Sequence, residues 1–148
     1  MQEYIYKRLS DIFYKQDFLN FIDCKLEKAD VGRVVISLEN KKEFSQALGF
    51  MHGGMVASML DTASGFAALS VLEDGKHVVT SELKINYLLP VVCKKLKCVG
   101  EVLKAGKTII VVEASVLDEE NKILAKMLGT MVVVPNSYKN DNKGDIKW

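Results

Sequence analysis

The sequence predicts an α+β fold in which a curved antiparallel β-sheet wraps around one long central helix. Three observations lead to this prediction: residues 55–72 are apolar nearly all round a helix, a two-stranded hairpin precedes them, and four extended segments follow. A helix that is apolar on every face has to be buried, and successive strands joined by short turns pair antiparallel. The sheet is therefore expected to enclose the helix.

The segments before the central helix predict one short helix and a hairpin. Apolar residues recur at helical spacing over residues 3–14, with charged residues on the other side, which is typical of an amphipathic helix that packs on the sheet. Extended patterns at 18–27 and 33–38 flank turn residues at 30–32 and predict the hairpin. Residues 41–49 are more polar and predict a loop or a single helical turn.

Four long strands are predicted after the central helix. They occupy residues 77–89, 92–104, 108–117 and 123–134, with turns at 105–106 and 118–121. In the first strand, simple alternation puts Val79, Leu83 and Ile85 on one face and Thr80 on the opposite, polar face. A long strand of this kind at an exposed sheet edge invites pairing with a second copy, so we predict at least a homodimer.

Length and composition narrow the classes of protein. With 148 residues, the chain is expected to form one domain over residues 1–135, followed by a polar tail at 136–148 that is expected to be disordered. The formal net charge is +1, so we expect no nucleic-acid partner. The three cysteines form no C-x-x-C pair and residues 1–13 lack a signal peptide's apolar core, which favours the cytoplasm. Polar residues within 55–72 argue against a membrane span.

Asp61 is the one charged residue in the central helix. A buried carboxylate is costly unless it is hydrogen-bonded, paired or neutralised, so Asp61 is predicted to lie in a cleft or to be held by specific partners. Its stripe of the helix consists otherwise of small residues: Ala57, Ser64, Gly65 and Ala68. The stripe indicates either a tight packing seam or room for a thin ligand beside the carboxylate.

The turn His52-Gly53-Gly54 opens the helix and indicates an oxyanion site. Free amides at a helix start, assisted by the helix dipole, can stabilise negative charge on a carbonyl oxygen, while a carboxylate nearby can act as base or nucleophile. Gly53 and Asp61 lie about 12 Å apart along one helix, at 1.5 Å per residue. They cannot serve the same carbonyl unless a second copy supplies one of them.

Other polar residues give weaker evidence for a functional site. His77 begins a strand and is expected to be exposed, and Ser58 lacks the G-x-S-x-G turn of a hydrolase nucleophile. Two histidines and three scattered cysteines provide no metal set, so no metal site is expected.

Three stretches of the sequence carry a family resemblance: Q-A-L-G-F-M-H-G-G-M-V-A-S-M-L-D at 46–61, V-T-S-E-L-K-I-N-Y-L-L-P at 79–90, and the hairpin at 106–107. They resemble the hotdog-fold acyl-CoA thioesterases, specifically the phenylacetate-degradation type, over about residues 43–134. The resemblance implies homodimers joined edge to edge, homotetramers built from them, and hydrolysis of an acyl-CoA thioester at the dimer interface. Coenzyme A would be part of the substrate, and no retained cofactor is expected.

The resemblance also implies roles for five residues. Gly53 would donate its amide to the thioester carbonyl, and Asp61 of the other subunit would activate water or attack directly. Thr80 stands where the family often has a serine or threonine that orients this water, and His52 stands where a histidine lines the site. Gln46 replaces the usual asparagine that helps to hold the carbonyl, and it has the same amide donor on a longer arm.

Two further functions stay open at the level of the sequence. A non-catalytic hotdog module could bind acyl-CoA as a ligand, and a hydratase or dehydratase of this fold would need a histidine paired with an acid. The sequence does not distinguish a nucleophile from a general base at Asp61. It also does not identify the acyl group or the basic residues that would contact the phosphates of coenzyme A.

Overall fold

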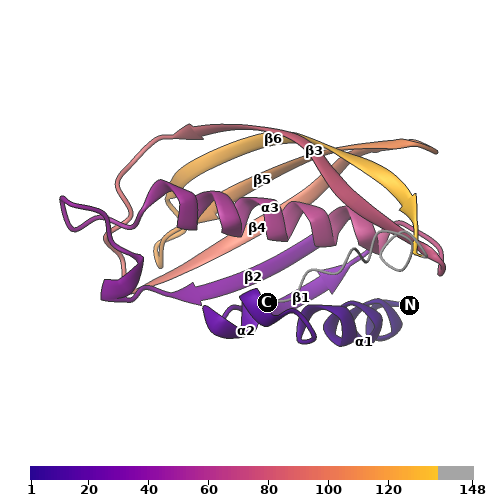
Figure 1. Cartoon of the computed structure of the whole chain (residues 1–148), viewed down its shortest axis with the longest axis horizontal. Coiled ribbons are helices and arrows are strands. Elements are labelled where there is room, and N and C mark those ends of the chain that lie inside the picture. Colours follow the sequence, from indigo (N-terminus) through magenta and orange to yellow (C-terminus); the bar gives the residue numbers. More distant parts are fainter. Residues whose placement is uncertain (137–148) are drawn as a thin grey trace, which may run out of the picture.

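The computed structural model of the protein describes residues 1–136 and shows a six-stranded antiparallel sheet curved around one long helix (Figure 1). The helices are α1 (Gln2–Phe13), α2 (Asp17–Phe21), the single 3-10 turn η1 (Lys42–Phe44) and α3 (Gly53–Ser70). The strands are β1 (Lys25–Asp30), β2 (Arg33–Glu39), β3 (Lys76–Tyr87), β4 (Lys95–Ala105), β5 (Ile109–Leu117) and β6 (Ile123–Pro135). Their order in the sheet is β1-β2-β4-β5-β6-β3. The predicted α+β architecture, the hotdog fold, is confirmed.

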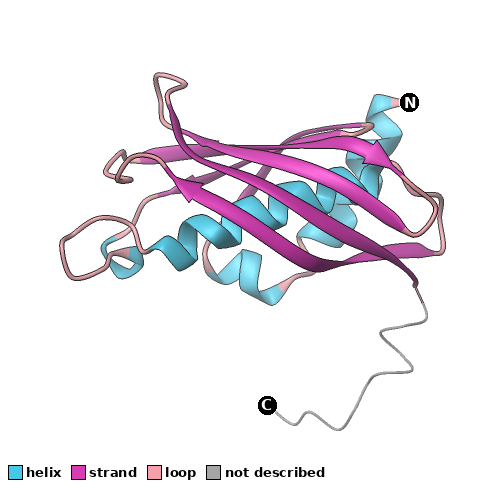
Figure 2. Ribbon diagram, turned by 90° about the horizontal axis from the view of Figure 1, so that it is seen from above, coloured by secondary structure: helices cyan, strands magenta, loops and turns pink. Residues whose placement is uncertain are grey.

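Helix α3 lies along the concave face of the sheet, and Figure 2 shows the strands crossing over it. Its residues Met59, Leu60 and Ala67 are completely or almost completely buried, as are the sheet residues Ile110 and Met127 that belong to the same core. An apolar surface all round the helix is stabilised only when the sheet covers it, which explains why the segment lacks an amphipathic pattern.

The helix approaches the sheet most closely at Gly100 of β4. A Cβ atom at this position would overlap the carbonyl group of Ala63 and lie 2.6 Å from the backbone nitrogen of Ser64. Only glycine allows the backbones of α3 and β4 to come so near. Ser64, from the predicted small-residue stripe, is therefore fully buried in a packing seam, while Asp61 and Gly65 of the same stripe are half-buried.

The N-terminal helix is confirmed, and it packs on the sheet beside β1 through Ile5, Leu9 and Phe13. Two tyrosines fix it there: the Tyr6 hydroxyl donates to Leu26 O at 3.2 Å, and the Tyr14 hydroxyl accepts from Leu26 N at 3.2 Å. Figure 1 shows α1 beside β1, on the opposite side of α3 from β3 and β6.

The strand predicted over 18–27 is wrong in its first half. Residues 17–21 form the single-turn helix α2, and β1 begins only at Lys25. The chain has to reverse after α1 to enter the sheet, and the short helix buries Leu19 while Phe18 and Phe21 stay exposed. The β-forming side chains of this segment thus gave the wrong prediction because the tertiary fold overrides local propensity.

The C-terminal end of α3 is bound by a side chain from α1. The Arg8 guanidinium donates to Leu69 O and Leu72 O, both at 2.8 Å, and contacts the Asp74 carboxylate at 3.3 Å. Leu69 O lies in the last turn of α3 and also accepts from Leu72 N at 3.2 Å, whereas Leu72 O follows the helix end, so the cation adds a strong donor to both carbonyls and also opposes the helix dipole.

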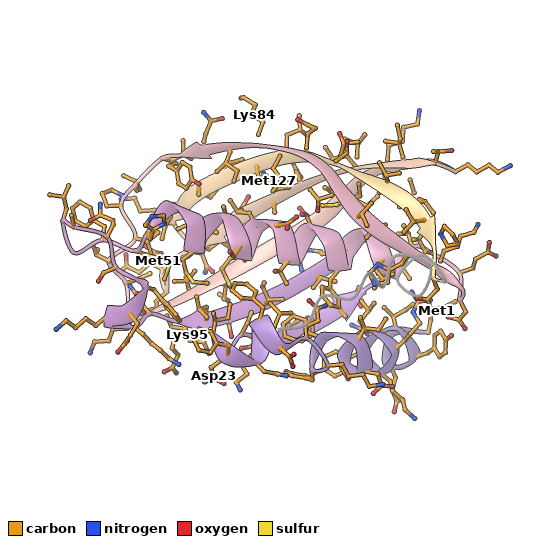
Figure 3. The ribbon with its side chains drawn as sticks, viewed as in Figure 1. Met1, Asp23, Met51, Lys84, Lys95 and Met127 are labelled. Atoms are coloured by element: carbon orange, nitrogen blue, oxygen red, sulfur yellow. The ribbon has the colours of Figure 1, made fainter. Side chains whose placement is uncertain are left out.

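Strand β3 forms one edge of the described sheet, because within residues 1–136 it pairs only with β6. Its pairing register shifts between Thr80 and Glu82, so Ser81 is an extra residue in a β-bulge. The bulge reverses the predicted faces at the start of the strand: Val78 is buried, Val79 is 41% exposed, and Thr80 turns to the side of α3. Beyond the bulge the predicted alternation holds, since Leu83 and Ile85 are half-buried and Lys84 points away from the sheet (Figure 3).

The predicted C-terminal tail lies mostly outside the described residues. Its first residue, Asn136, donates its backbone N–H to Gly75 O at 2.8 Å, which extends the pairing of β3 with β6 by one residue. None of the helices within residues 1–136 combines the length and the hydropathy that a membrane span requires.

Candidate active site

Asp61 lies on the half-buried face of α3 that looks toward the edge strand. The Thr80 hydroxyl donates to Asp61 Oδ1 at 2.7 Å, and among the described residues no other donor contacts this carboxylate. A hydroxyl that donates to one oxygen orients the carboxylate and leaves the second oxygen free. Both predictions for Asp61 are therefore met, since it faces a cleft and also has a specific partner.

A hollow of about 180 Å³ opens beside Asp61 and Thr80. Its walls include Gly65 and Leu69 from α3, His77 and Val78 from the start of β3, and Gln16 from the segment after α1. The carboxylate is thus placed at the mouth of a space that a small group can enter. Only because of the β-bulge does Thr80 share this space with Asp61.

The N-terminus of α3 has one backbone amide without a partner among the described residues. His52 is the N-cap, and its Nδ1 accepts from Gly54 N at 2.8 Å, while Met55 N and Val56 N bond to His52 O. The Gly53 amide has no acceptor within residues 1–136, and Gly53 is half-buried, so this amide can donate to a ligand at the positive end of the helix dipole.

His52 therefore has a structural function that sequence reasoning did not identify. Because Nδ1 accepts a hydrogen bond from Gly54, the neutral ring carries its proton on Nε2, which remains available as a second donor. A Cβ atom at Gly54 would lie 3.0 Å from His52 Nδ1, so glycine at this position keeps the imidazole in place.

Tyr87, at the far end of β3, also contacts the helix start. Its hydroxyl donates to Gly53 O at 3.0 Å, and its ring lies against the Gly53 α-carbon, with the nearest ring atom 3.4 Å from a Cβ built there. The edge strand is thus joined to α3 at two places, near Thr80 through Asp61 and at Tyr87 through Gly53. The sequence did not indicate this contact, because the alternation of the strand predicts only on which face of the sheet Tyr87 lies.

Gln46 lies in the loop that leads to the helix. Its side-chain oxygen accepts from Leu48 N within the same loop, and its backbone N–H donates to Phe50 O at 2.8 Å. The carboxamide nitrogen has no partner among residues 1–136 and remains a donor. The structure thus places Gln46, His52 and Gly53 at one end of α3, and Asp61 with Thr80 about two helical turns away.

Comparison with known proteins identifies the family. The sequence pattern of the thioesterase superfamily matches residues 48–125, which is more than half of the chain. The chain belongs to the thioesterase superfamily. A Saccharolobus solfataricus protein, whose name proposes an esterase activity, is 38% identical over 129 residues, which cover 86% of this chain and 91% of that protein. Human acyl-coenzyme A thioesterase 13 is 30% identical over 104 residues, or 70% of this chain and 71% of that protein.

Solved structures agree with this thioesterase assignment. A thioesterase family protein from Silicibacter pomeroyi is 27% identical with a TM-score of 0.85, and the match covers 89% of this chain and 99% of that one. The Escherichia coli PaaI protein of the phenylacetic acid degradation operon shares the fold, with a TM-score of 0.84 at 19% identity over 90% of this chain and 95% of that one. The protein is therefore a hotdog-fold thioester hydrolase.

The structure corrects one expectation about the surroundings of the thioesterase site. His77, which was expected to be exposed, is half-buried and lines the hollow beside Asp61. Its ring is held by its own strand, because Nδ1 lies 2.9 Å from Val78 N. The start of β3 folds over the end of α3, and this non-local contact leaves no signal in the local sequence.

Two of the three thiols of the thioesterase are buried and unsuited to nucleophilic attack. Burial raises the pKa of the Cys24 thiol to about 12, and burial also raises the pKa of Cys98. A thiol that stays protonated at neutral pH is a poor nucleophile. Within residues 1–136, no group of three or more His, Cys, Asp or Glu side chains could hold a metal ion.

Proposed function

We propose that the protein hydrolyses acyl-CoA thioesters at sites built from two copies of the chain. The observation that carries this proposal is that Asp61 and Gly53 are each hydrogen-bonded to the edge strand β3, one near its start and the other at its end. Within one chain, Asp61 and Gly53 are too far apart to contact the same carbonyl group. A second copy is what brings an acid and an oxyanion donor to the same carbonyl.

Edge-to-edge pairing of two β3 strands supplies the required geometry. Antiparallel strands related by a two-fold axis near Leu83 and Lys84 would put Thr80 of one copy near Tyr87 of the other. Because Thr80 holds Asp61 and Tyr87 holds Gly53, this register would bring the carboxylate of one copy near the free amide of the other. The symmetry creates two such sites in each homodimer.

The chemistry follows from these two groups. The Gly53 amide donates to the thioester oxygen and stabilises the negative charge that develops there. Asp61, oriented by Thr80, takes a proton from water as the hydroxide adds to the carbonyl carbon. The carbon–sulfur bond then breaks, and the leaving thiolate takes up the proton, so the products are a carboxylic acid and free coenzyme A. Direct attack by Asp61 through a transient anhydride would use the same residues.

Two further donors belong to the oxyanion end of this proposed site. The Gln46 amide nitrogen and His52 Nε2–H have no hydrogen-bond partner among residues 1–136, and in this proposal both would donate to a substrate beside Gly53. Gln46 would replace the carbonyl-holding asparagine of the family. The main role of His52 would be to stabilise the N-terminus of α3, because its Nδ1 accepts the hydrogen bond from Gly54 N.

Acyl-CoA as substrate is supported by two relatives. One is the human acyl-coenzyme A thioesterase already described, and the other is a Streptococcus mutans protein solved with acetyl CoA bound, 27% identical over 76% of this chain and 89% of that one with a TM-score of 0.70. In this proposal coenzyme A is part of the substrate and there is no resident cofactor. The homodimers would pair into homotetramers, and the free cysteines favour a cytoplasmic location.

A complementation experiment tests the shared site. Gly53→Pro removes the amide donor at the first helical position, where proline is tolerated, and His52 already has the extended backbone that precedes a proline (φ −59°, ψ 135°). Gly53→Ala keeps the donor and is the matched control. We expect thiol release to fall about 100-fold or more in Gly53→Pro and in Asp61→Asn, and to change little in Gly53→Ala or in the surface variant Asp17→Asn.

Co-expression of Gly53→Pro with Asp61→Asn then distinguishes the two arrangements. A mixed dimer has one doubly damaged site and one intact site, so mixing the two inactive variants is expected to restore about a quarter of the parent activity. Failure to restore activity in proven mixed dimers would refute the shared site. Tight acyl-CoA binding without turnover in the parent would instead favour a binding module, and hydration of an enoyl-CoA would favour a hydratase.

A further inference from the structure

The hollow beside Asp61 does not end within α3 and β3. It continues into a groove of about 720 Å³ that runs between α1, the end of α3 and the start of β3. Four residues line both spaces and mark their junction: Gln16, Leu69, His77 and Val78. The groove is therefore an extension of the site that contains the proposed catalytic acid, and its volume lies in the range of about 300–1,000 Å³ that is typical of ligand pockets.

The chemistry of the groove favours an uncharged occupant. Its apolar wall consists of Ile12 from α1, Leu69 from α3, Val78 and Val79 from β3, and Val134 and Pro135 from β6. Two of the cations at its rim already have partners, since Arg8 bonds to the helix end and to Asp74, and Lys76 pairs with Glu73 at 2.6 Å. A hydrocarbon chain would gain burial there without leaving a buried charge unpaired.

Two residues line the passage from Asp61 into the groove. Gly65 lies one helical turn beyond Asp61 and lines the hollow, and a Cβ atom built on it meets nothing within 4 Å. Unlike Gly100, this glycine is therefore not required by packing, and the space above it is open. Gln16 lies at the junction, and its exposed side chain makes no hydrogen bond among residues 1–136.

We propose that this groove binds the acyl chain of the substrate, and that Gly65 and Gln16 set the chain length that the enzyme accepts. The preferred substrates would be thioesters of uncharged acyl chains long enough to pass Gly65 and lie along α1. The inference rests on the proposed function in that it takes acyl-CoA as the ligand of the Asp61 site. Helix α1 becomes a wall of the substrate site, held in place by its contacts with Leu26 and with the end of α3.

The experiment measures binding with S-alkyl-coenzyme A thioethers of increasing chain length. These analogues lack the cleavable carbonyl, so calorimetry reports the acyl-chain contacts whether or not the protein hydrolyses the thioester. For the parent, affinity is expected to rise by up to about fourfold for each added methylene until the groove is filled. Gly65→Leu and Gln16→Trp should stop this rise early and lower the long-chain to short-chain affinity ratio by about tenfold or more.

Controls and outcomes separate this inference from the proposed function. Gln2→Trp places the same side chain on α1 outside the groove and should keep the parent ratio, and the ratio itself cancels any difference in the amount of folded protein. The inference would be overturned if the parent bound all chain lengths with the same affinity. It would also be overturned if both groove variants kept the parent's long-chain to short-chain affinity ratio. Chain-dependent binding without any thiol release would support it and refute the proposed hydrolysis of acyl-CoA.

Discussion

Replacing Arg8 by methionine tests whether one side chain holds α1 against the end of α3. The change keeps most of the apolar stem but removes the guanidinium that donates to Leu69 O and Leu72 O at 2.8 Å. The Arg8 side chain is only 18% exposed, and Leu69 is buried, so water replaces these hydrogen bonds incompletely. Leu72 O would then lose its side-chain donor, and Leu69 O would keep only the 3.2 Å hydrogen bond from Leu72 N.

The expected loss follows from these contacts. Hydrogen bonds to a charged group contribute about 1.5–3 kcal/mol each, and a cation at a helix C-terminus adds about 0.3–1 kcal/mol. Since Leu72 is half-buried and its carbonyl can be partly hydrated, we expect the free energy of unfolding to fall by about 2–4 kcal/mol. For a domain of this size that corresponds to a melting temperature lower by about 5–12 °C.

The other arginine of the chain provides the control. Arg33 pairs with Glu101 at 3.0 Å, but the two side chains are 48% and 44% exposed, so Arg33→Met is expected to cost no more than about 1 kcal/mol. Urea and thermal unfolding of both variants measure the difference, and Arg8→Lys should lie between them because an ammonium cannot reproduce the two-pronged contact. Equal losses for Arg8→Met and Arg33→Met would refute the reasoning.

Three further predictions follow from single contacts. Gly65→Ala should raise the free energy of unfolding by about 0.5–1 kcal/mol, because alanine favours the helix and the space is open, whereas Gly100→Ala should lower it by about 3 kcal/mol or more through overlap with α3. Thr80→Val should lower kcat about 10- to 100-fold by releasing Asp61, while Thr80→Ser should keep most of the activity. The Cys24 thiol should react with a thiol reagent only after unfolding, because burial raises its pKa to about 12.

Each of these predictions has a clear contrary result. Similar melting temperatures for the two glycine variants would show that α3 and β4 are not in close contact at Gly100. Equal kcat values for Thr80→Val and Thr80→Ser would remove the hydroxyl from the mechanism. The raised pKa of the Cys24 thiol also makes stability depend on pH. The thiol ionises near 9.0 in the unfolded chain and only near 12 in the folded protein, so the free energy of unfolding should fall as the pH rises above 9.0. A Cys24→Ala variant that keeps the full alkaline loss would contradict this contribution.

The sequence alone determined the architecture because its signals are local. Apolar residues all round residues 55–72 require a buried helix, and the turns after residues 105 and 118 join strands that pair with each other. The pairings of β2 with β4 and of β3 with β6 join strands that are distant in the sequence, and the local signals do not specify them. The exposed edge, the unusual carboxylate at Asp61 and the free amide of a helix that begins with glycine could also be predicted. The 12 Å separation of Gly53 and Asp61 along the helix already indicated that one chain holds two half-sites.

Only the tertiary structure decided how those residues are used. The bulge at Ser81 turns Thr80 toward Asp61, contrary to simple alternation, because strand β3 has to follow the curvature of the sheet around α3. The contacts of Tyr87 with Gly53 and of Arg8 with the helix end join residues more than thirty positions apart, which no local pattern reports. The groove that continues the hollow beside Asp61 is likewise formed where α1, α3 and β3 meet. Its existence depends on how three elements pack, while the periodicity of each specifies only which of its faces is buried.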